Sequence, residues 1–248
     1  MVVAVPGYPG GPRDFRWLAS ALGSDVRFIR LAMPGFELTP LSTEPAVDLL
    51  GRSRFVARAI EALDLSDVFL VGHSLGGGLA GIAATELADR VRGVALLCSI
   101  GATPHPGVEG VSIKVAARMG RWPLVGWLVQ RSLPMVFEQM GFPRRWSIPQ
   151  LLHTIDCAAA LEFAPWAERI PTLPAPTLVA WGEDDPLIPT EISRALAELA
   201  PDGPRLVLPS GGHNIQKHHA VELAGEIRAM LGLSPRPPDA PPDLPGDH

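Results

Sequence analysis

The fold of this chain is decided by the stretch Val68-Phe69-Leu70-Val71-Gly72-His73-Ser74-Leu75-Gly76-Gly77-Gly78. It begins as an apolar run typical of a buried strand and continues into small residues that predict a helix. Between the two, the pattern Gly-x-Ser-x-Gly predicts a sharp turn with Ser74 at its apex. A plain glycine-rich turn is the alternative interpretation. Because open α/β sheets bind ligands at the carboxyl ends of their strands, we expect Ser74 to face a functional site.

Outward from this stretch, short apolar runs alternate with helical patterns. The expected strands cover residues 2–5, 26–31, 68–72, 91–98, 177–181 and 205–208. Strands that alternate with helices predict an α/β fold with a mostly parallel sheet of about six strands and flanking helices. The runs are almost continuously apolar, as expected when helices bury both faces of the sheet.

The strand pattern stops between about Thr103 and Pro174, where tryptophan, methionine and proline accumulate. We therefore predict an α/β core over residues 1–103 and 175–233, with a helical cap insertion over residues 104–174. The tryptophan, methionine and leucine side chains of the insertion are expected to form an apolar roof over a pocket. Residues 234–248 are rich in proline and poor in aliphatic residues, so we expect this tail to be disordered.

Composition narrows the classes of partner. The formal net charge is -5, and the 21 Lys and Arg residues are scattered, which argues against a nucleic-acid surface. No apolar run approaches 18 residues, so no stable membrane association is expected. Cys98 and Cys157 are interpreted as reduced core residues. The first residues lack the basic region of a secretory signal, which favours the cytoplasm. The acidic net charge and the scattered cations favour a small-molecule substrate.

A serine hydroxyl becomes an effective nucleophile when an imidazole takes its proton and a carboxylate orients that imidazole. His213 follows the last expected strand in a glycine-rich loop, and the trio Glu183-Asp184-Asp185 follows the strand over residues 177–181. A solvated turn that caps the next helix is the alternative for the acidic trio. His218 and His219 have no metal-ligand spacing relative to His213, so neither a metal nor another cofactor is expected.

The segment Gly72-His73-Ser74-Leu75-Gly76-Gly77 resembles the nucleophile elbow of the α/β-hydrolase superfamily, especially its compact esterases and carbon–carbon bond hydrolases. The resemblance extends over about residues 2–232. It implies Ser74 as nucleophile, His213 as base and Asp185, from the pattern Gly-x-x-Asp, as acid, with Asp184 as the near rival. Serine at position 74 disfavours dehalogenation and epoxide opening, for which relatives use aspartate. His73 is expected to point away from Ser74.

The resemblance also implies an oxyanion hole, formed by the backbone N–H groups of Leu75 and Tyr8. Pro9 has no N–H to donate. Pro6 stands where relatives usually carry a histidine that braces this loop, so a simple turn is the alternative interpretation.

Relatives generally have two further strands before this loop, and either a truncated sequence or a smaller sheet would explain the difference. In a smaller sheet, the strand over residues 26–31 lies at an edge, which favours a homo-oligomer unless the edge is covered.

The resulting hypothesis is a serine hydrolase that cleaves a small, largely apolar carboxylic ester through an acyl-enzyme. A carbon–carbon bond hydrolase, a lactonase, a thioesterase or an acyltransferase would use the same triad. A non-catalytic hydrolase-like binding protein is the alternative from another class.

Overall fold

The computed structural model describes residues 1–36, 47–105, 111–122, 126–140, 142, 144–174 and 176–235. A six-stranded sheet has the order β2-β1-β3-β4-β5-β6, and each neighbouring pair is parallel. The strands are β1 (Val2–Val5), β2 (Phe28–Arg30), β3 (Val68–His73), β4 (Val91–Leu97), β5 (Thr177–Gly182) and β6 (Arg205–Leu208). The predicted α/β class is confirmed. Strand β2 lies at an edge as expected, but it is shorter than residues 26–31.

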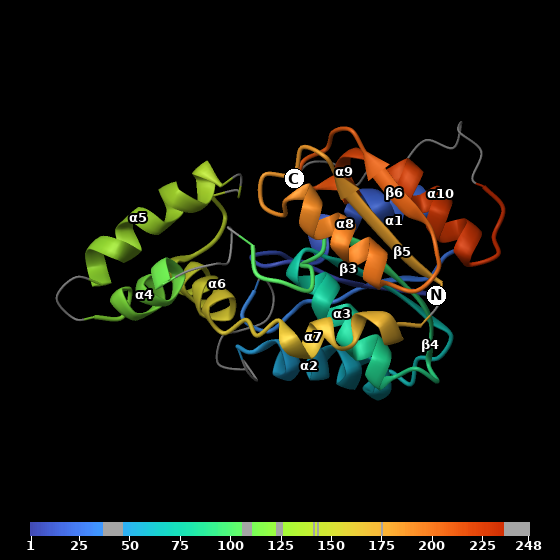
Figure 1. Cartoon of the computed structure of the whole chain (residues 1–248), viewed down its shortest axis with the longest axis horizontal. Coiled ribbons are helices and arrows are strands. Elements are labelled where there is room, and N and C mark those ends of the chain that lie inside the picture. The colour runs from blue at the N-terminus through green and yellow to red at the C-terminus, as the bar shows by residue number, and fades with distance from the viewer. Residues whose placement is uncertain are drawn as a thin grey trace.

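Helices cover both faces of this sheet (Figure 1). Val2 and Ala4 of β1 belong to the apolar cluster on one face, and Val3 and Val5 belong to the cluster on the other. This division follows from the two-residue period of a strand. The first cluster contains residues of α1 (Arg16–Leu22) and α10 (Ala220–Met230), and the second contains residues of α2 (Leu49–Ala62), α3 (Leu75–Glu86) and α8 (Thr190–Leu199). Shorter helices are η1 (Pro12–Phe15) and α9 (Ile215–His218).

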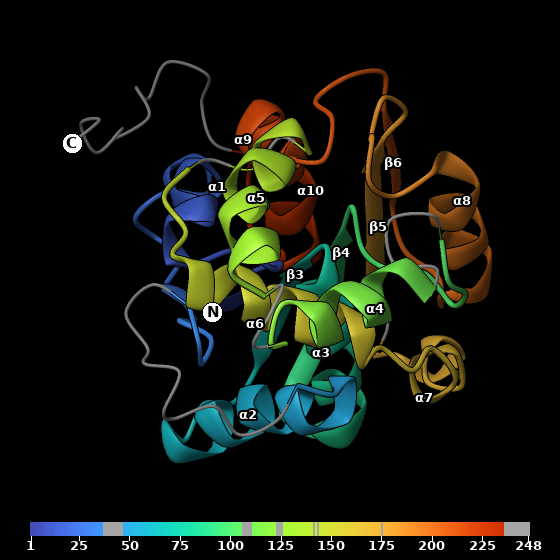
Figure 2. The same cartoon turned by 90° about the vertical axis from the view of Figure 1, so that its left-hand side faces the viewer.

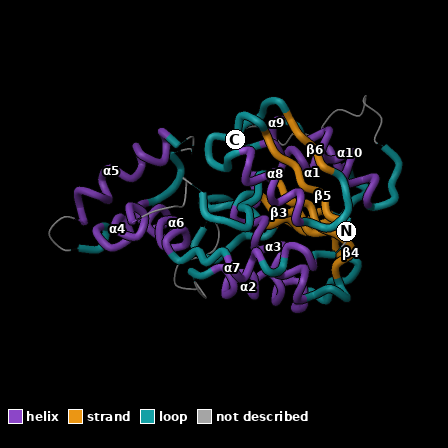
Figure 3. Tube along the Cα trace, viewed as in Figure 1, coloured by secondary structure: helices purple, strands orange, loops and turns teal. Residues whose placement is uncertain are grey.

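A group of helices from the middle of the chain lies beside this core (Figures 1 and 2). It consists of helices joined by loops (Figure 3), namely α4 (Val111–Met119), α5 (Gly126–Gln139) and α6 (Ile148–Ala159). The chain returns to β5 through α7 (Ala164–Ala167) and η3 (Ile170–Thr172). We call α4 to α6 and their connections the cap. The predicted bounds of residues 104–174 for this insertion stay a prediction.

The predicted disorder of the tail stays a prediction too, since residues 236–248 lie outside the described residues. Within the described parts of the chain, every helix is too short or too polar to span a membrane.

Trp166 of α7 packs the segment between the cap and β5 against the core. Its side chain is completely buried, and its indole N–H donates to the carbonyl oxygen of Ile100 at 3.2 Å. The ring lies so close to Gly81 of α3 that a Cβ added there would be 2.4 Å from it. A bulky ring against a glycine is the close packing expected in a protein core.

Trp166→Ala is expected to lower the free energy of unfolding by about 3–5 kcal/mol, because it leaves a cavity and removes the donor of Ile100. Trp122→Ala is the matched control, since the Trp122 side chain is 58% exposed and its loss should cost less than about 0.5 kcal/mol. Urea denaturation of both variants measures the difference. Equal losses would contradict the packing role of Trp166.

Candidate active site

Ser74 lies at the turn between β3 and α3 with φ 55° and ψ -126°. This positive φ is unfavourable for a residue with a side chain. The turn is possible because its neighbours are glycines: a Cβ on Gly72 would lie 2.4 Å from the Gly76 oxygen, and a Cβ on Gly76 would lie 2.4 Å from the oxygens of Val5 and Pro6. The turn therefore has the sharp geometry that the sequence predicts.

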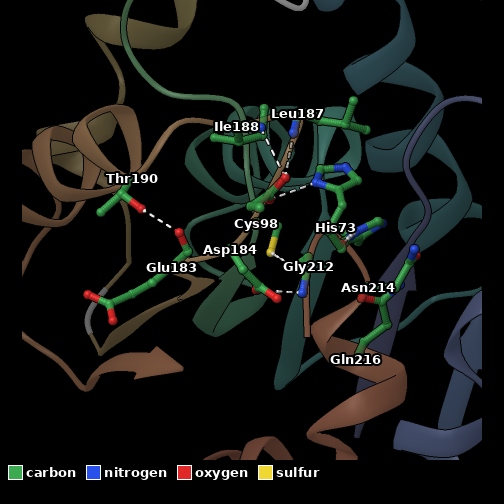
Figure 4. Close-up of polar contacts among 12 residues, drawn as sticks. His73, Cys98, Glu183, Asp184, Leu187, Ile188, Thr190, Gly212, Asn214 and Gln216 are labelled. Atoms are coloured by element: carbon green, nitrogen blue, oxygen red, sulfur yellow. Dashed lines mark hydrogen bonds and ion pairs between the residues drawn. The ribbon is translucent and has the colours of Figure 1, made fainter. Parts of the chain in front are cut away.

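His213, in the loop after β6, forms a close pair with Asp185, in the loop after β5. Its Nδ1 lies 2.8 Å from Asp185 Oδ2, and both side chains are buried. The backbone N–H groups of Leu187 and Ile188 donate to Asp185 Oδ1 at 2.8 and 3.1 Å (Figure 4). His213 and Ser74 line the same cavity. The structure thus brings the three candidate residues to one end of the sheet.

Opposing effects determine the pKa of Asp185. Burial acts to raise this pKa, but the hydrogen bond and charge of His213, together with the two backbone donors, lower it below its usual value. The carboxylate is therefore ionised at neutral pH. Its neighbour Asp184 has a different contact, because Asp184 Oδ1 accepts a hydrogen bond from Gly212 N–H at 2.7 Å (Figure 4). Of the two rivals, Asp185 contacts the His213 ring and Asp184 fixes the loop before it.

His73, the last residue of β3, contacts the backbone of the loop that carries His213. Sequence reasoning missed this contact. His73 Nε2 lies 2.6 Å from the carbonyl oxygen of His213, and the two ring centroids are 4.8 Å apart. Burial, followed by the charge of His213, lowers the pKa of His73 to about 3. His73 is therefore neutral at neutral pH, and its Nε2–H donates to that oxygen. The position of His73 next to Ser74 was the signal that the sequence offered. This signal does not identify the partner of His73, which lies 140 residues away.

Tyr8 and Leu75, the expected oxyanion-hole residues, line an apolar cavity together with Ser74. Leu75 is the first residue of α3, where N–H groups have no acceptor within the helix. The Tyr8 loop is braced without the histidine that Pro6 replaces. Asp14 Oδ2 accepts from Gly11 N–H at 2.7 Å.

Arg52, on α2, supplies the second brace. Its side chain is almost fully buried, and Nη1 donates to the Tyr8 hydroxyl at 2.6 Å. Its Nη2 contacts Nε2 of His153 on α6, so the same guanidinium links the Tyr8 loop to the cap. Sequence reasoning missed Arg52, although its spacing from Leu49 and Val56 places it on the buried face of α2.

Two cavities meet at Ser74. The apolar cavity, of about 110 Å³, lies between the core and the cap. The second cavity, of about 210 Å³, is the more polar of the two, because His213, Asn214 and Arg145 are among its lining residues, and we call it the polar cavity. The cap side of the apolar cavity is formed by Phe137, Met140, Phe142, Thr154, Ile155, Ala158 and Leu161.

The expectation that tryptophans roof the pocket is wrong for most of them. Trp122 and Trp127 are exposed, Trp166 packs beneath α3, and Trp146 lines the polar cavity. The hydrophobicity of such rings predicts that they are buried, but it does not predict which surface they pack against.

Cys98, Asp185 and His213 offer ligand atoms within 4.8 Å of one another. These residues are poorly suited to a metal. His213 Nδ1 and Asp185 Oδ2 already bond each other, and burial, followed by the charge of Asp185, raises the pKa of the Cys98 thiol. A metal requires the thiolate, which this environment disfavours.

Comparisons with known proteins agree with the α/β fold of this chain. Residues 2–226 match the model of a family described as the Alpha/beta hydrolase family. The dihydrolipoyllysine-residue acetyltransferase component of an acetoin cleaving system from Pseudomonas putida is 26% identical over 238 residues, and the alignment covers 93% of this chain but only 63% of that protein. The 2-hydroxy-6-oxo-6-phenylhexa-2,4-dienoate hydrolase of Burkholderia cepacia is 27% identical over 229 residues, covering 87% of this chain and 80% of the relative.

Among solved structures, an esterase from Exiguobacterium antarcticum superposes with a TM-score of 0.71. The alignment covers 93% of this chain and 91% of the esterase at 18% sequence identity. At this identity the likeness shows a shared fold.

The neutral state of His73 generates a prediction about stability. Between pH 6.5 and about pH 3, the unfolded chain binds a proton at this histidine that the folded chain does not bind. Stability should therefore fall on acidification through this range, by up to about 1.4 kcal/mol per pH unit from this group. His73→Gln keeps an N–H donor but removes the titration, so its stability should fall less steeply. Urea denaturation at several pH values measures both slopes, and parallel slopes would contradict the neutral assignment.

Proposed function

Because the chain belongs to the alpha/beta hydrolase family, we propose that it is a serine hydrolase that cleaves a small, largely apolar carboxylic ester through an acyl-enzyme. The observation that carries this proposal is the buried His213–Asp185 pair, of which His213 lines a cavity that Ser74 also lines. An ionised carboxylate bonded to an imidazole beside a strained serine is the arrangement that activates a hydroxyl nucleophile.

In the proposed reaction, Ser74 Oγ attacks the ester carbonyl carbon while its proton passes to His213 Nε2. The carbonyl oxygen becomes an oxyanion, which accepts hydrogen bonds from the N–H groups of Leu75 and Tyr8. The bond to the alcohol oxygen then breaks, and His213 gives its proton to that oxygen. Water repeats the same steps on the acyl-enzyme and releases the carboxylic acid. Asp185 stabilises the imidazolium that forms in each step.

The lining of the two cavities supports a proposal for where each part of the ester binds. His213 must reach the departing alcohol oxygen, and it lines the polar cavity but not the apolar one. The alcohol therefore occupies the polar cavity. The acyl group occupies the apolar cavity, whose lining of side chains such as Ile100, Phe137 and Leu161 favours an apolar group.

Hydrolysis of a carbon–carbon bond is the second candidate, supported by the relative from Burkholderia cepacia. The compound in that enzyme's name, 2-hydroxy-6-oxo-6-phenylhexa-2,4-dienoate, contains a ketone and no ester. Its hydrolysis must break a carbon–carbon bond, and the same serine, histidine and oxyanion donors could act at the ketone. A lactonase, a thioesterase, an acyltransferase and a non-catalytic binding protein are the remaining alternatives.

Ser74→Ala and His213→Ala are expected to lower kcat/KM for p-nitrophenyl butyrate by about 10³–10⁶, because they remove the nucleophile and the base. A fluorophosphonate should label the parent protein at Ser74. His218→Ala is the control, since His218 is exposed on α9 and should be replaceable without loss. Comparable losses at both histidines would show that the base is misassigned.

A substrate panel separates the candidate functions. Turnover of p-nitrophenyl esters well above that of the phenylhexadienoate would support the ester hydrolase, and the reverse would support carbon–carbon cleavage. A folded protein that reacts with neither the substrates nor the fluorophosphonate would favour the non-catalytic binding protein.

A further inference from the structure

His105 is a buried imidazole in the wall of the apolar cavity. Its side chain belongs to the loop that follows β4, and the residue is 3% exposed. Within the part of the chain that the structure describes, neither Nδ1 nor Nε2 has a hydrogen-bond partner. Burying an imidazole without hydrogen-bond partners costs free energy in the substrate-free protein. A bound substrate that pairs with the ring would offset this cost.

The other polar side chains around the apolar cavity have assigned contacts or roles. The Tyr8 hydroxyl accepts from Arg52, and the Thr154 hydroxyl donates to the carbonyl oxygen of Gln150 at 2.9 Å. Ser74 is the proposed nucleophile. Of the described residues that line this cavity, His105 is thus the one whose hydrogen-bonding capacity is unused.

The protonation state of His105 limits what it can bind. Burial, followed by the charge of His213, lowers the pKa of His105 below its usual value, although Asp185 opposes this effect. The ring is therefore neutral at neutral pH, with one N–H donor and one acceptor nitrogen. A neutral donor in an apolar wall favours an uncharged oxygen, since a carboxylate would lose its hydration there without a cation to compensate.

We propose that the His105 ring, whose two nitrogens are covered in the substrate-free protein, turns toward the cavity when substrate binds and donates a hydrogen bond to an uncharged oxygen atom within the acyl part of the substrate. It thereby selects oxygen-bearing acyl groups, such as ether or keto acyl groups, over alkyl chains of the same length. The inference rests on the proposed function, because that function places the acyl group in the apolar cavity. His105 is a specificity-determining residue, since the proposed proton transfers at Ser74 and His213 do not involve it.

Isosteric pairs of p-nitrophenyl esters test the proposal. The pairs are 3-methoxypropanoate with pentanoate, 4-methoxybutanoate with hexanoate, and 4-oxopentanoate with 4-methylpentanoate. In each pair an oxygen-bearing unit replaces a hydrocarbon unit of similar size, and the two oxygen positions in the ether pairs sample different depths of the cavity. The ether and keto arms distinguish the two sources of the acceptor oxygen.

For at least one pair, we expect the ratio of kcat/KM for the oxygen-bearing ester to kcat/KM for the alkyl ester to be about tenfold higher in the parent than in His105→Phe. Comparing the same pair in both proteins cancels the intrinsic reactivity of the esters. His105→Gln restores an N–H donor and should recover part of the preference. Trp122→Phe, a change at an exposed ring that does not line the cavity, should leave each ratio as it is in the parent.

A thermal readout distinguishes this role from a structural one. Replacing an unpaired imidazole with an apolar ring should raise Tm, by about 2–4 °C. A marked loss of stability in His105→Phe, or unchanged ester ratios in all pairs while the esters are still hydrolysed, would overturn the inference alone. Failure of the parent protein to hydrolyse any of the esters would overturn the proposed ester hydrolysis and the inference with it.

Discussion

The close approach of the first turn of α3 to the ends of β1 and β3 is the constraint on which the site depends. Gly76 packs against the carbonyl oxygens of Val5 and Pro6 with no room for a side chain. Chain continuity then forces Ser74 to a positive φ, a conformation that costs about 1–3 kcal/mol and must be held by its surroundings. Neighbouring backbone holds it, since Ser74 N–H donates to Leu97 and the Ser74 carbonyl accepts from Ile100 N–H.

The His213 loop is fixed in a comparable way by side chains from three other strand ends. Asp184, after β5, accepts from Gly212 N–H, while Cys98, after β4, lies 3.7 Å from the Gly212 oxygen (Figure 4). His73, the last residue of β3, contacts the carbonyl oxygen of His213 itself. The backbone around the imidazole is thus held on both sides before any substrate binds. Such preorganisation is what a site needs if its polar groups are to act without reorganising.

The sequence could predict the sheet and the turn because these features are written in local patterns, whereas the roles of His213 and Asp185 were implied by the resemblance to the α/β hydrolases. Gly72 and Gly76 mark the turn, and near-continuous apolar runs mark strands buried on both faces. The braces of the Tyr8 loop are different. Arg52 lies 44 residues from Tyr8 and 101 residues from His153, and periodicity indicates that Arg52 is buried without indicating what it meets. For the same reason, the hydrophobicity of the tryptophans did not indicate which surface each ring would contact.

The buried groups around His213 also show why burial alone does not decide charge. Burial disfavours the charged form of both His73 and Asp185. Asp185 keeps its charge because His213 and two backbone N–H groups donate to it. The charge of His213 adds to the effect of burial at His73, which stays neutral. The imidazole of His213 therefore lies near the fixed negative charge of Asp185 and the neutral ring of His73, so a proton that it accepts is stabilised by Asp185 and is not repelled by His73.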